Sequence, residues 1–215
     1  MKIFLMFLLA AMLLNAGKYD KVKITPEISY VLVYHNGKSV KVHRIQDINH
    51  RLTGKYTKIS RPCPGQCIQP ISMGLDIDTI GEVEVVEFLK GNVNSRKGLL
   101  IDVREKKQYR IETIPSSVNI PYSIHNDLEA MDSIFDALGM KKRADNSWDT
   151  ANALDLVFYC NGLWCAKSSD FIREFVDRGY PASKIRYYRG GFQMWKILGF
   201  TTVKAKQKGS KDAKR

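Results

Sequence analysis

The sequence predicts an α/β protein built on a parallel sheet with helices on both faces. Three short apolar runs, at residues 98–103, 154–160 and 185–188, lack the alternation of half-buried strands. Stretches with the helical spacing of apolar residues lie between them. Continuous apolar strands that alternate with helices are typical of a parallel sheet covered on both faces. Binding sites of such sheets lie beyond the carboxyl ends of the strands.

The first residues of the chain predict a secretory signal peptide. Residues 1–16 combine one lysine, an uncharged run from Ile3 to Leu14 and the small residue Ala16. The run matches the apolar region of a signal peptide and is too short for a bilayer core of about 30 Å. We therefore expect an exported, periplasmic protein without a membrane span once the signal is removed. Leu14 is unusual in a cleavage site, which leaves an uncleaved anchor open.

The charge of the chain does not predict a nucleic-acid partner. The 215 residues are 44% hydrophobic and 26% charged, as in an ordinary globular protein, and the formal net charge is +12. Residues 79–203 carry only +1 of this charge, and the excess lies in residues 17–78 and 204–215. A basic excess outside the largest unit argues against nucleic-acid binding. Residues 204–215 lack apolar periodicity and are expected to form a disordered tail.

Residues 17–78 predict a small β-containing accessory segment. The runs 28–34 and 39–45 alternate well enough for two strands of a hairpin. Between them lies Asn36-Gly37, the strongest short sequence for a hairpin turn.

The end of this segment holds a first pair of cysteines. Cys63 and Cys67 flank Pro-Gly-Gln, and we expect a disulfide in an exported chain because Pro-Gly forms the tight turn that it needs. A free redox pair that serves Cys160 is the alternative. A zinc site with Cys160 and Cys165 does not fit, because the spacings are not those of zinc ligands. The four histidines show no ligand spacing either, so we expect no metal.

From Thr79 onward the pattern predicts the main domain, residues 79–203. Thr79 is expected to cap a helix over 80–90, which precedes the strand 98–103. The later elements in order are a helix over 126–138 that turns Leu128 inward, the strand 154–160, a helix over 166–179, the strand 185–188, and a short helix carrying Trp195.

The loop after strand 154–160 is the candidate reaction centre. Cys160 ends the strand, and a helix starts about six residues later. A short loop that enters a helix N-terminus turns several backbone N–H groups toward one point. Such surroundings favour the thiolate, which is the reactive form of cysteine. An inert cysteine buried at a strand end is the alternative interpretation.

The main domain resembles the rhodanese (sulfurtransferase) domain. The resemblance rests on five stretches in the right order: IDVRE (101–105), IPSSVNIPY (114–122), LVFYCNGLWC (156–165), DRGYP (177–181) and YYRGGFQMWKILGF (187–200). It implies a five-stranded parallel α/β fold in which Cys160 is the catalytic nucleophile. Its thiolate would take sulfane sulfur from a donor as a persulfide and pass it to a thiophilic acceptor, without a cofactor. The Cys-Asn-Gly-x-Trp-Cys loop resembles an exported, sulfur-handling subset of the family.

The resemblance also implies which residues surround the substrate. They are Asn161, Gly162, Leu163, Trp164, Cys165 and, as the nearest basic side chain, Lys167. Cys165 stands where many family members have an arginine that can hold an anionic donor. Polysulfide or a protein persulfide is therefore as suitable a donor as thiosulfate. We expect the Cys165 thiol at the rim of the loop and not essential for sulfur transfer.

Asp102 and Arg104 follow the family pattern for residues beneath or beside the loop. In one interpretation Asp102 orients the loop and Arg104 adds positive potential. In the other the two residues form a buried structural ion pair.

Two other functions remain open. A non-catalytic rhodanese-like module would bind a sulfur-carrier partner through its N-terminal segment. A thiol–disulfide oxidoreductase would use Cys160 and Cys165, although their spacing is wider than the usual Cys-x-x-Cys. A cysteine phosphatase does not fit, because Ala166 stands where its phosphate-binding arginine would be.

Overall fold

The computed structural model describes residues 21–205 and confirms the predicted parallel sheet. The predicted signal peptide at residues 1–16 and most of the predicted tail lie outside the described residues. Five strands form the sheet: β3 (Asp78–Ile80), β4 (Gly98–Asp102), β5 (Val118–Asn119), β8 (Asp155–Tyr159) and β9 (Ile185–Tyr188). Their spatial order is β3-β9-β8-β4-β5, and every neighbouring pair is parallel.

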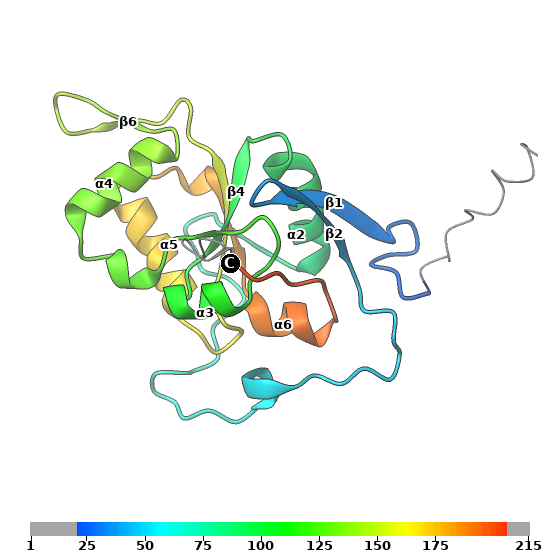
Figure 1. The fold of residues 1–215 in the computed structure, drawn as a ribbon. Helices are drawn as coiled ribbons and strands as arrows, with labels where there is room; N and C mark the ends of the chain where they lie inside the picture. Colours follow the sequence, from blue (N-terminus) through cyan, green and yellow to red (C-terminus); the bar gives the residue numbers. More distant parts are fainter. Residues whose placement is uncertain (1–20, 206–215) are drawn as a thin grey trace, which may run out of the picture.

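Helices cover both faces of this sheet (Figure 1). The α-helices are α2 (Glu82–Phe88), α3 (Lys106–Ile111), α4 (Leu128–Ala137), α5 (Lys167–Asp177) and α6 (Gly191–Ile197). A π-helical turn, η2 (Leu89–Val93), continues α2, and the 3-10 turns are η1 (Gly54–Thr57), η3 (Tyr122–Ile124) and η4 (Ala182–Lys184).

The side chains of β8 show why the strand is apolar throughout. Phe158 packs with Phe171 and Phe175 of α5 in one core cluster, whereas Tyr159 belongs to the second cluster, with Trp195 of α6. Successive residues of the strand thus face opposite helical layers, and neither face meets solvent.

The N-terminal hairpin joins the second of these clusters. Strands β1 (Tyr30–His35) and β2 (Lys38–His43) pair antiparallel, as predicted, around Asn36 and Gly37, which both have positive φ (51° and 76°). Val33 and Val42 are fully buried in the same cluster as Trp195. The accessory segment therefore shares the core of the main domain.

A second, smaller antiparallel pair of strands is formed by β6 (Lys141–Lys142) and β7 (Trp148–Asp149).

Two local predictions are wrong. Thr79 does not cap a helix: it lies inside β3, and Gly81 precedes α2 instead, with the Gly81 N–H donating to the Glu84 carboxylate (3.0 Å). An edge strand of three residues is too short to show a periodicity. Leu128 is 63% exposed because it lies in the first turn of α4, which faces solvent.

Candidate active site

The Cys160 loop, residues 160–166, leads from β8 into α5 at the carboxyl end of the sheet. The N–H of Phe192, at the start of α6, donates to the carbonyl of Cys160 (2.9 Å). Gly191 has φ +60°, and a β-carbon there would lie 2.7 Å from the same carbonyl oxygen. Glycine is required at this point because any side chain would separate α6 from the loop.

Both cysteines of the loop are buried, and they form a disulfide. Cys160 is 1% and Cys165 6% exposed, and their Cα atoms lie 6.2 Å apart. The expectation that Cys165 lies at the rim is therefore wrong. The Cys165 N–H donates to the carbonyl of Gly162 (2.9 Å), and this turn folds Cys165 inward against the core.

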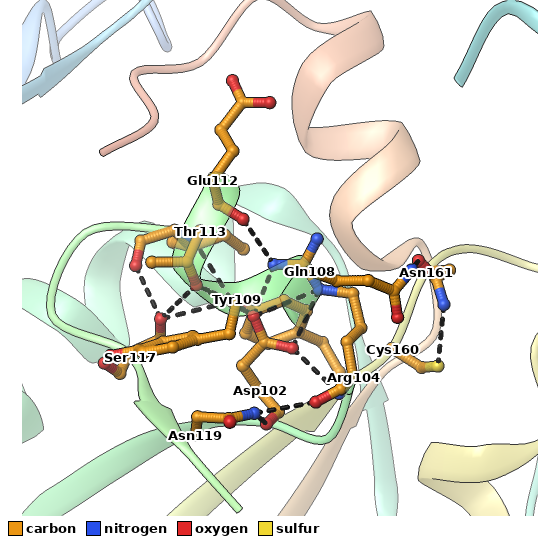
Figure 2. A network of polar contacts seen from close by, with 12 residues as sticks. Asp102, Arg104, Gln108, Tyr109, Glu112, Thr113, Ser117, Asn119, Cys160 and Asn161 are labelled. Atoms are coloured by element: carbon orange, nitrogen blue, oxygen red, sulfur yellow. Dashed lines mark hydrogen bonds and ion pairs between the residues drawn. The ribbon is translucent and has the colours of Figure 1, made fainter. Parts of the chain in front are cut away.

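The side chain of Asn161 has a fixed orientation beside Cys160 (Figure 2). Its Oδ1 accepts hydrogen bonds from Gln108 Nε2 (2.9 Å) and from the hydroxyl of Tyr56 (3.2 Å). Because both neighbours donate to this atom, it must be the amide oxygen. The amide NH₂ group therefore faces Cys160 Sγ at 3.7 Å. Asn161 is thus a hydrogen-bond donor to the sulfur.

Asp102 and Arg104 form a buried ion pair beneath the loop. Asp102 is fully buried and Arg104 is 1% exposed, and Arg104 Nε donates to the carboxylate at 2.9 Å. The carboxylate also accepts from the hydroxyls of Thr113 and Tyr159, each at 2.8 Å. Burial acts to lower the pKa of Arg104, but the adjacent Asp102 raises it overall. Arg104 therefore keeps its charge, and both side chains of the buried pair have several hydrogen-bond partners, which favours the structural interpretation.

Hydrogen bonds link Arg104 to the Cys160 loop through Tyr56. Its Nη1 donates to the Tyr56 hydroxyl (3.0 Å), which in turn donates to Asn161. Burial raises the pKa of Tyr56, so the hydroxyl keeps the proton that it donates. This chain of contacts links the buried cation to the amide that faces Cys160.

The remaining predicted loop residues have other partners. Lys167 Nζ pairs with Glu105 Oε1 (2.7 Å), so its charge is directed toward the start of α3. Trp164 Nε1 donates to Gln193 Oε1 (2.7 Å). Within residues 21–205, the backbone N–H groups of 162–164 donate no hydrogen bond.

A second stretch of chain, which the sequence did not predict to take part, lies over the loop. We call residues 53–70 the covering segment; it runs in cyan below α6 in Figure 1. Besides Tyr56 it supplies Arg61, whose guanidinium lies 3.8 Å from the centre of the Trp164 ring, and Gln69, whose N–H donates to the Leu163 carbonyl (2.9 Å). These contacts join residues about a hundred positions apart, and no local sequence pattern could have revealed them.

A cavity of about 340 Å³ separates the covering segment from α3 and α6. Its walls include Lys55 and Tyr56 from the segment, Gln108 from α3, and Phe192 and Lys196 from α6. Burial, and then the charges of nearby arginines, lower the pKa of Lys55. Tyr56 and Gln108, which hold Asn161, thus form part of the cavity wall.

The other predicted cysteine pair lies in the covering segment. Cys63 and Cys67 are at disulfide distance, with Cα atoms 4.8 Å apart, and Cys63 is exposed.

Among the residues that the structure describes, no group of three or more His, Cys, Asp or Glu side chains is placed to hold a metal ion. None of the helices within residues 21–205 is long and apolar enough to cross a membrane.

The fold and the loop define an α/β domain with a cysteine at the carboxyl end of a central strand. The family model described as "Rhodanese-like domain" matches residues 85–198. The chain therefore belongs to the rhodanese-like family.

One curated relative and several solved structures resemble the chain. The thiosulfate:glutathione sulfurtransferase of Saccharomyces cerevisiae is 39% identical over 64 residues, which are 29% of this chain and 41% of that protein. An uncharacterised protein from the same yeast is 27% identical, with a TM-score of 0.41 over 58% of this chain and 94% of that one. A human single-domain sulfurtransferase is 22% identical, with a TM-score of 0.39 over 55% and 95% of the two chains.

Proposed function

We propose that this protein moves sulfane sulfur from a donor to a thiophilic acceptor through a persulfide on Cys160. One observation carries the proposal: Cys160 ends β8 beside a side-chain amide that donates to its sulfur, and it begins a loop whose backbone N–H groups at 162–164 donate no hydrogen bond within residues 21–205. A persulfide anion is stabilised by such donors in the way that an oxyanion is. The sulfurtransferase names of two relatives agree with this chemistry.

The first step requires the reduced form of the Cys160–Cys165 pair. The Cys160 thiolate attacks the outer sulfur of the donor, and a new S–S bond forms. The bond between that sulfur and the rest of the donor breaks, and the donor leaves with the electron pair. Cys160 then carries the transferred sulfur as a persulfide.

In the second step a nucleophile attacks the outer sulfur of the persulfide. The Cys160–sulfur bond breaks and returns its electron pair to the thiolate, which is ready for another donor. The name of the yeast relative pairs thiosulfate with glutathione, so a small thiol is the acceptor class that we propose first. Thiosulfate, polysulfide and a protein persulfide are the candidate donors.

Two residues outside the loop have a positioning role in this proposal. Gln108 and Tyr56 hold the Asn161 oxygen and thereby direct the amide NH₂ toward Cys160. Without them the amide can rotate, and its oxygen would repel a thiolate or a persulfide. Asp102 and Arg104 support the arrangement through Tyr56.

The test is to load the reduced protein with polysulfide, to stop the reaction at once with acid, which suppresses attack by the Cys165 thiolate, and to measure the intact mass. We expect a gain of about 32 Da, one sulfur atom, which cyanide removes as thiocyanate. The Cys160→Ser variant is expected to gain nothing and to form no thiocyanate. Equal loading of this variant and the wild type would reject the proposal.

The Cys160–Cys165 disulfide favours a second candidate, a thiol–disulfide oxidoreductase. Because both sulfurs are buried, a protein disulfide has poor access to them. We therefore expect no acceleration of insulin reduction by dithiothreitol. An acceleration that Cys160→Ser abolishes would support this candidate over sulfur transfer.

We also propose that the protein acts outside the cytoplasm, in the periplasm. The proposal rests on residues 1–16 and is supported by the Cys63–Cys67 pair at disulfide distance. Fractionation of the producing cell tests it, since a cytoplasmic product of full mass would contradict export.

A further inference from the structure

We propose that Cys165 attacks the Cys160 persulfide from within the same loop, releases the transferred sulfur as sulfide, and closes the Cys160–Cys165 disulfide. The protein would then be a sulfide-releasing reductase of sulfane sulfur as well as a transferase. This inference rests on the proposed function, because it starts from the Cys160 persulfide.

The first argument is the geometry of the loop. The Cα atoms of the two cysteines lie 6.2 Å apart, within the range in which a disulfide forms without backbone movement. A hydrogen bond from the Phe192 N–H to the Cys160 carbonyl holds the loop against α6. A second hydrogen bond, from the Cys165 N–H to the Gly162 carbonyl, forms a turn within the loop. Closing the disulfide therefore does not require the loop to leave its place on the domain.

The second argument is burial. Cys160 and Cys165 belong to the same core cluster and expose 1% and 6% of their surface. A thiol held beside a buried persulfide acts at a far higher effective concentration than any thiol in solution. The covering segment restricts external access further, because Gln69 and Arg61 contact Leu163 and Trp164, two of the four loop residues between these cysteines.

The third argument is the position of Cys165 in the chain. It lies two residues before Lys167, the first residue of α5, a helix of 11 residues. The positive end of the helix dipole favours a thiolate there, and the thiolate is the attacking species. Cys160 lies farther back and is contacted by the Asn161 NH₂ group instead. The two sulfurs thus have different stabilising groups, which suits one carrier and one attacking thiol.

The step balances in atoms and electrons. The Cys165 thiolate attacks Sγ of Cys160, the inner sulfur of the persulfide, and the Cys160–Cys165 bond forms. The bond from Sγ to the outer sulfur breaks, the outer sulfur leaves with the electron pair, and it takes a proton from water to form hydrosulfide. The sulfane sulfur gains two electrons, which the two cysteine sulfurs lose.

An external dithiol returns the pair to the reduced state. Cys165 is the more exposed of the two cysteines, so we expect the dithiol to attack there. Cys160 is then the leaving thiolate, beside the Asn161 donor, and it is again ready to accept sulfur. The dithiol is oxidised to its own disulfide in this reset.

A single-turnover experiment tests the inference. Reduced full-length protein is freed of reductant, loaded anaerobically with about one equivalent of polysulfide sulfur, and followed by intact mass and sulfide assay without any added thiol. We expect wild type to release about one sulfide per chain beyond the sulfide left by the donor during loading, and to end about 2 Da lighter than the reduced protein. The Cys165→Ser and Cys165→Ala variants are expected to keep the added sulfur and to release less than a tenth of this additional sulfide.

Control measurements separate this inference from the proposed function. Cyanide must still strip sulfur from both Cys165 variants as thiocyanate, which shows that they fold and carry a persulfide. The Cys63→Ser/Cys67→Ser double variant is expected to release sulfide as wild type does, at a rate independent of protein concentration. If wild type keeps its persulfide until cyanide is added, and cyanide then removes the sulfur as thiocyanate, the inference is overturned and the proposed function stands. If no variant with Cys160 takes up sulfur, the proposed function itself fails.

Discussion

The chain holds two cysteine pairs with similar spacing, and the structure surrounds them in opposite ways. The surface pair, Cys63 and Cys67, lies in an irregular stretch of the covering segment, and Cys63 is exposed. The core pair, Cys160 and Cys165, is almost completely buried at the carboxyl end of β8. Both pairs lie at disulfide distance. Their spacing in the sequence therefore says little about what each pair does.

The difference lies in what contacts the sulfurs. Beside the core pair are an oriented side-chain amide, backbone N–H groups that have no acceptor among residues 21–205, and the start of an 11-residue helix. The surface pair closes a short turn of the covering segment. We infer that the surface pair stabilises the segment that carries Tyr56, whereas the core pair carries the chemistry.

Exchanging the carrier cysteine should give the largest effect. We predict that Cys160→Ser lowers the rate of thiocyanate formation at least about a thousandfold, because the attacking thiolate is lost. The Cys63→Ser/Cys67→Ser double variant is the matched control and should stay within about twofold of wild type. Similar losses in both proteins would remove the distinction between the pairs.

Breaking the surface pair should instead affect stability. A disulfide that closes so short a loop contributes about 2 kcal/mol at most, through the entropy of the unfolded chain. We predict that the double variant loses up to this amount in denaturant unfolding under oxidising conditions, and that the difference vanishes in the presence of reductant. An equal difference in both conditions would show that the thiols, and not the bond, stabilise the fold.

Tyr56 is one of the links between the covering segment and the Cys160 loop, and removing its hydroxyl should have an intermediate effect on the rate. Tyr56→Phe keeps the ring in the core but removes the hydrogen bonds to Arg104 and Asn161. We predict a loss of about tenfold in sulfur transfer, about 1.4 kcal/mol in the barrier. Tyr34→Phe, at a residue that is 70% exposed, is the control. An unchanged rate in Tyr56→Phe would show that Gln108 alone orients the amide.

The smallest effect that we predict is a loss of folding stability at acid pH that depends on Glu112, the residue that follows α3. Burial acts to raise the pKa of Glu112, but hydrogen bonds from Lys196 (2.6 Å) and Thr202 lower it overall. The resulting stability is complete above the ordinary pKa near 4.5 and is lost as the pH falls through the lowered value. Unfolding measured between neutral and acid pH should therefore show a steeper loss for wild type than for Glu112→Gln, by less than about 1 kcal/mol. Parallel curves for the two proteins would contradict the shift.

The sequence was informative where a residue's role depends on its neighbours along the chain. Apolar runs predicted β4, β8 and β9, and Asn36-Gly37 predicted the hairpin, because burial and turn chemistry are local patterns. The same reasoning missed β3 because three residues at a sheet edge carry no period.

The candidate site shows the same division. The position of Cys160 after an apolar strand could be predicted, but the burial of Cys165 could not, because it depends on a turn that folds the loop inward. Tyr56 and Arg61 were missed because their contacts with the loop cross about a hundred residues of sequence. The covering segment has no regular structure apart from one 3-10 turn, so its sequence gives no indication of the surface on which it lies.

The central claim is that sulfur resides on Cys160 and on no other cysteine. Its most direct test is peptide mapping of the reduced wild-type protein after loading with about one equivalent of polysulfide sulfur and immediate alkylation at low pH, which slows attack by Cys165. We predict that the peptide with Cys160 carries the additional mass of about 32 Da and that the peptide with Cys63 and Cys67 does not. Additional sulfur on the Cys63–Cys67 peptide, with Cys160 unmodified, would contradict the account.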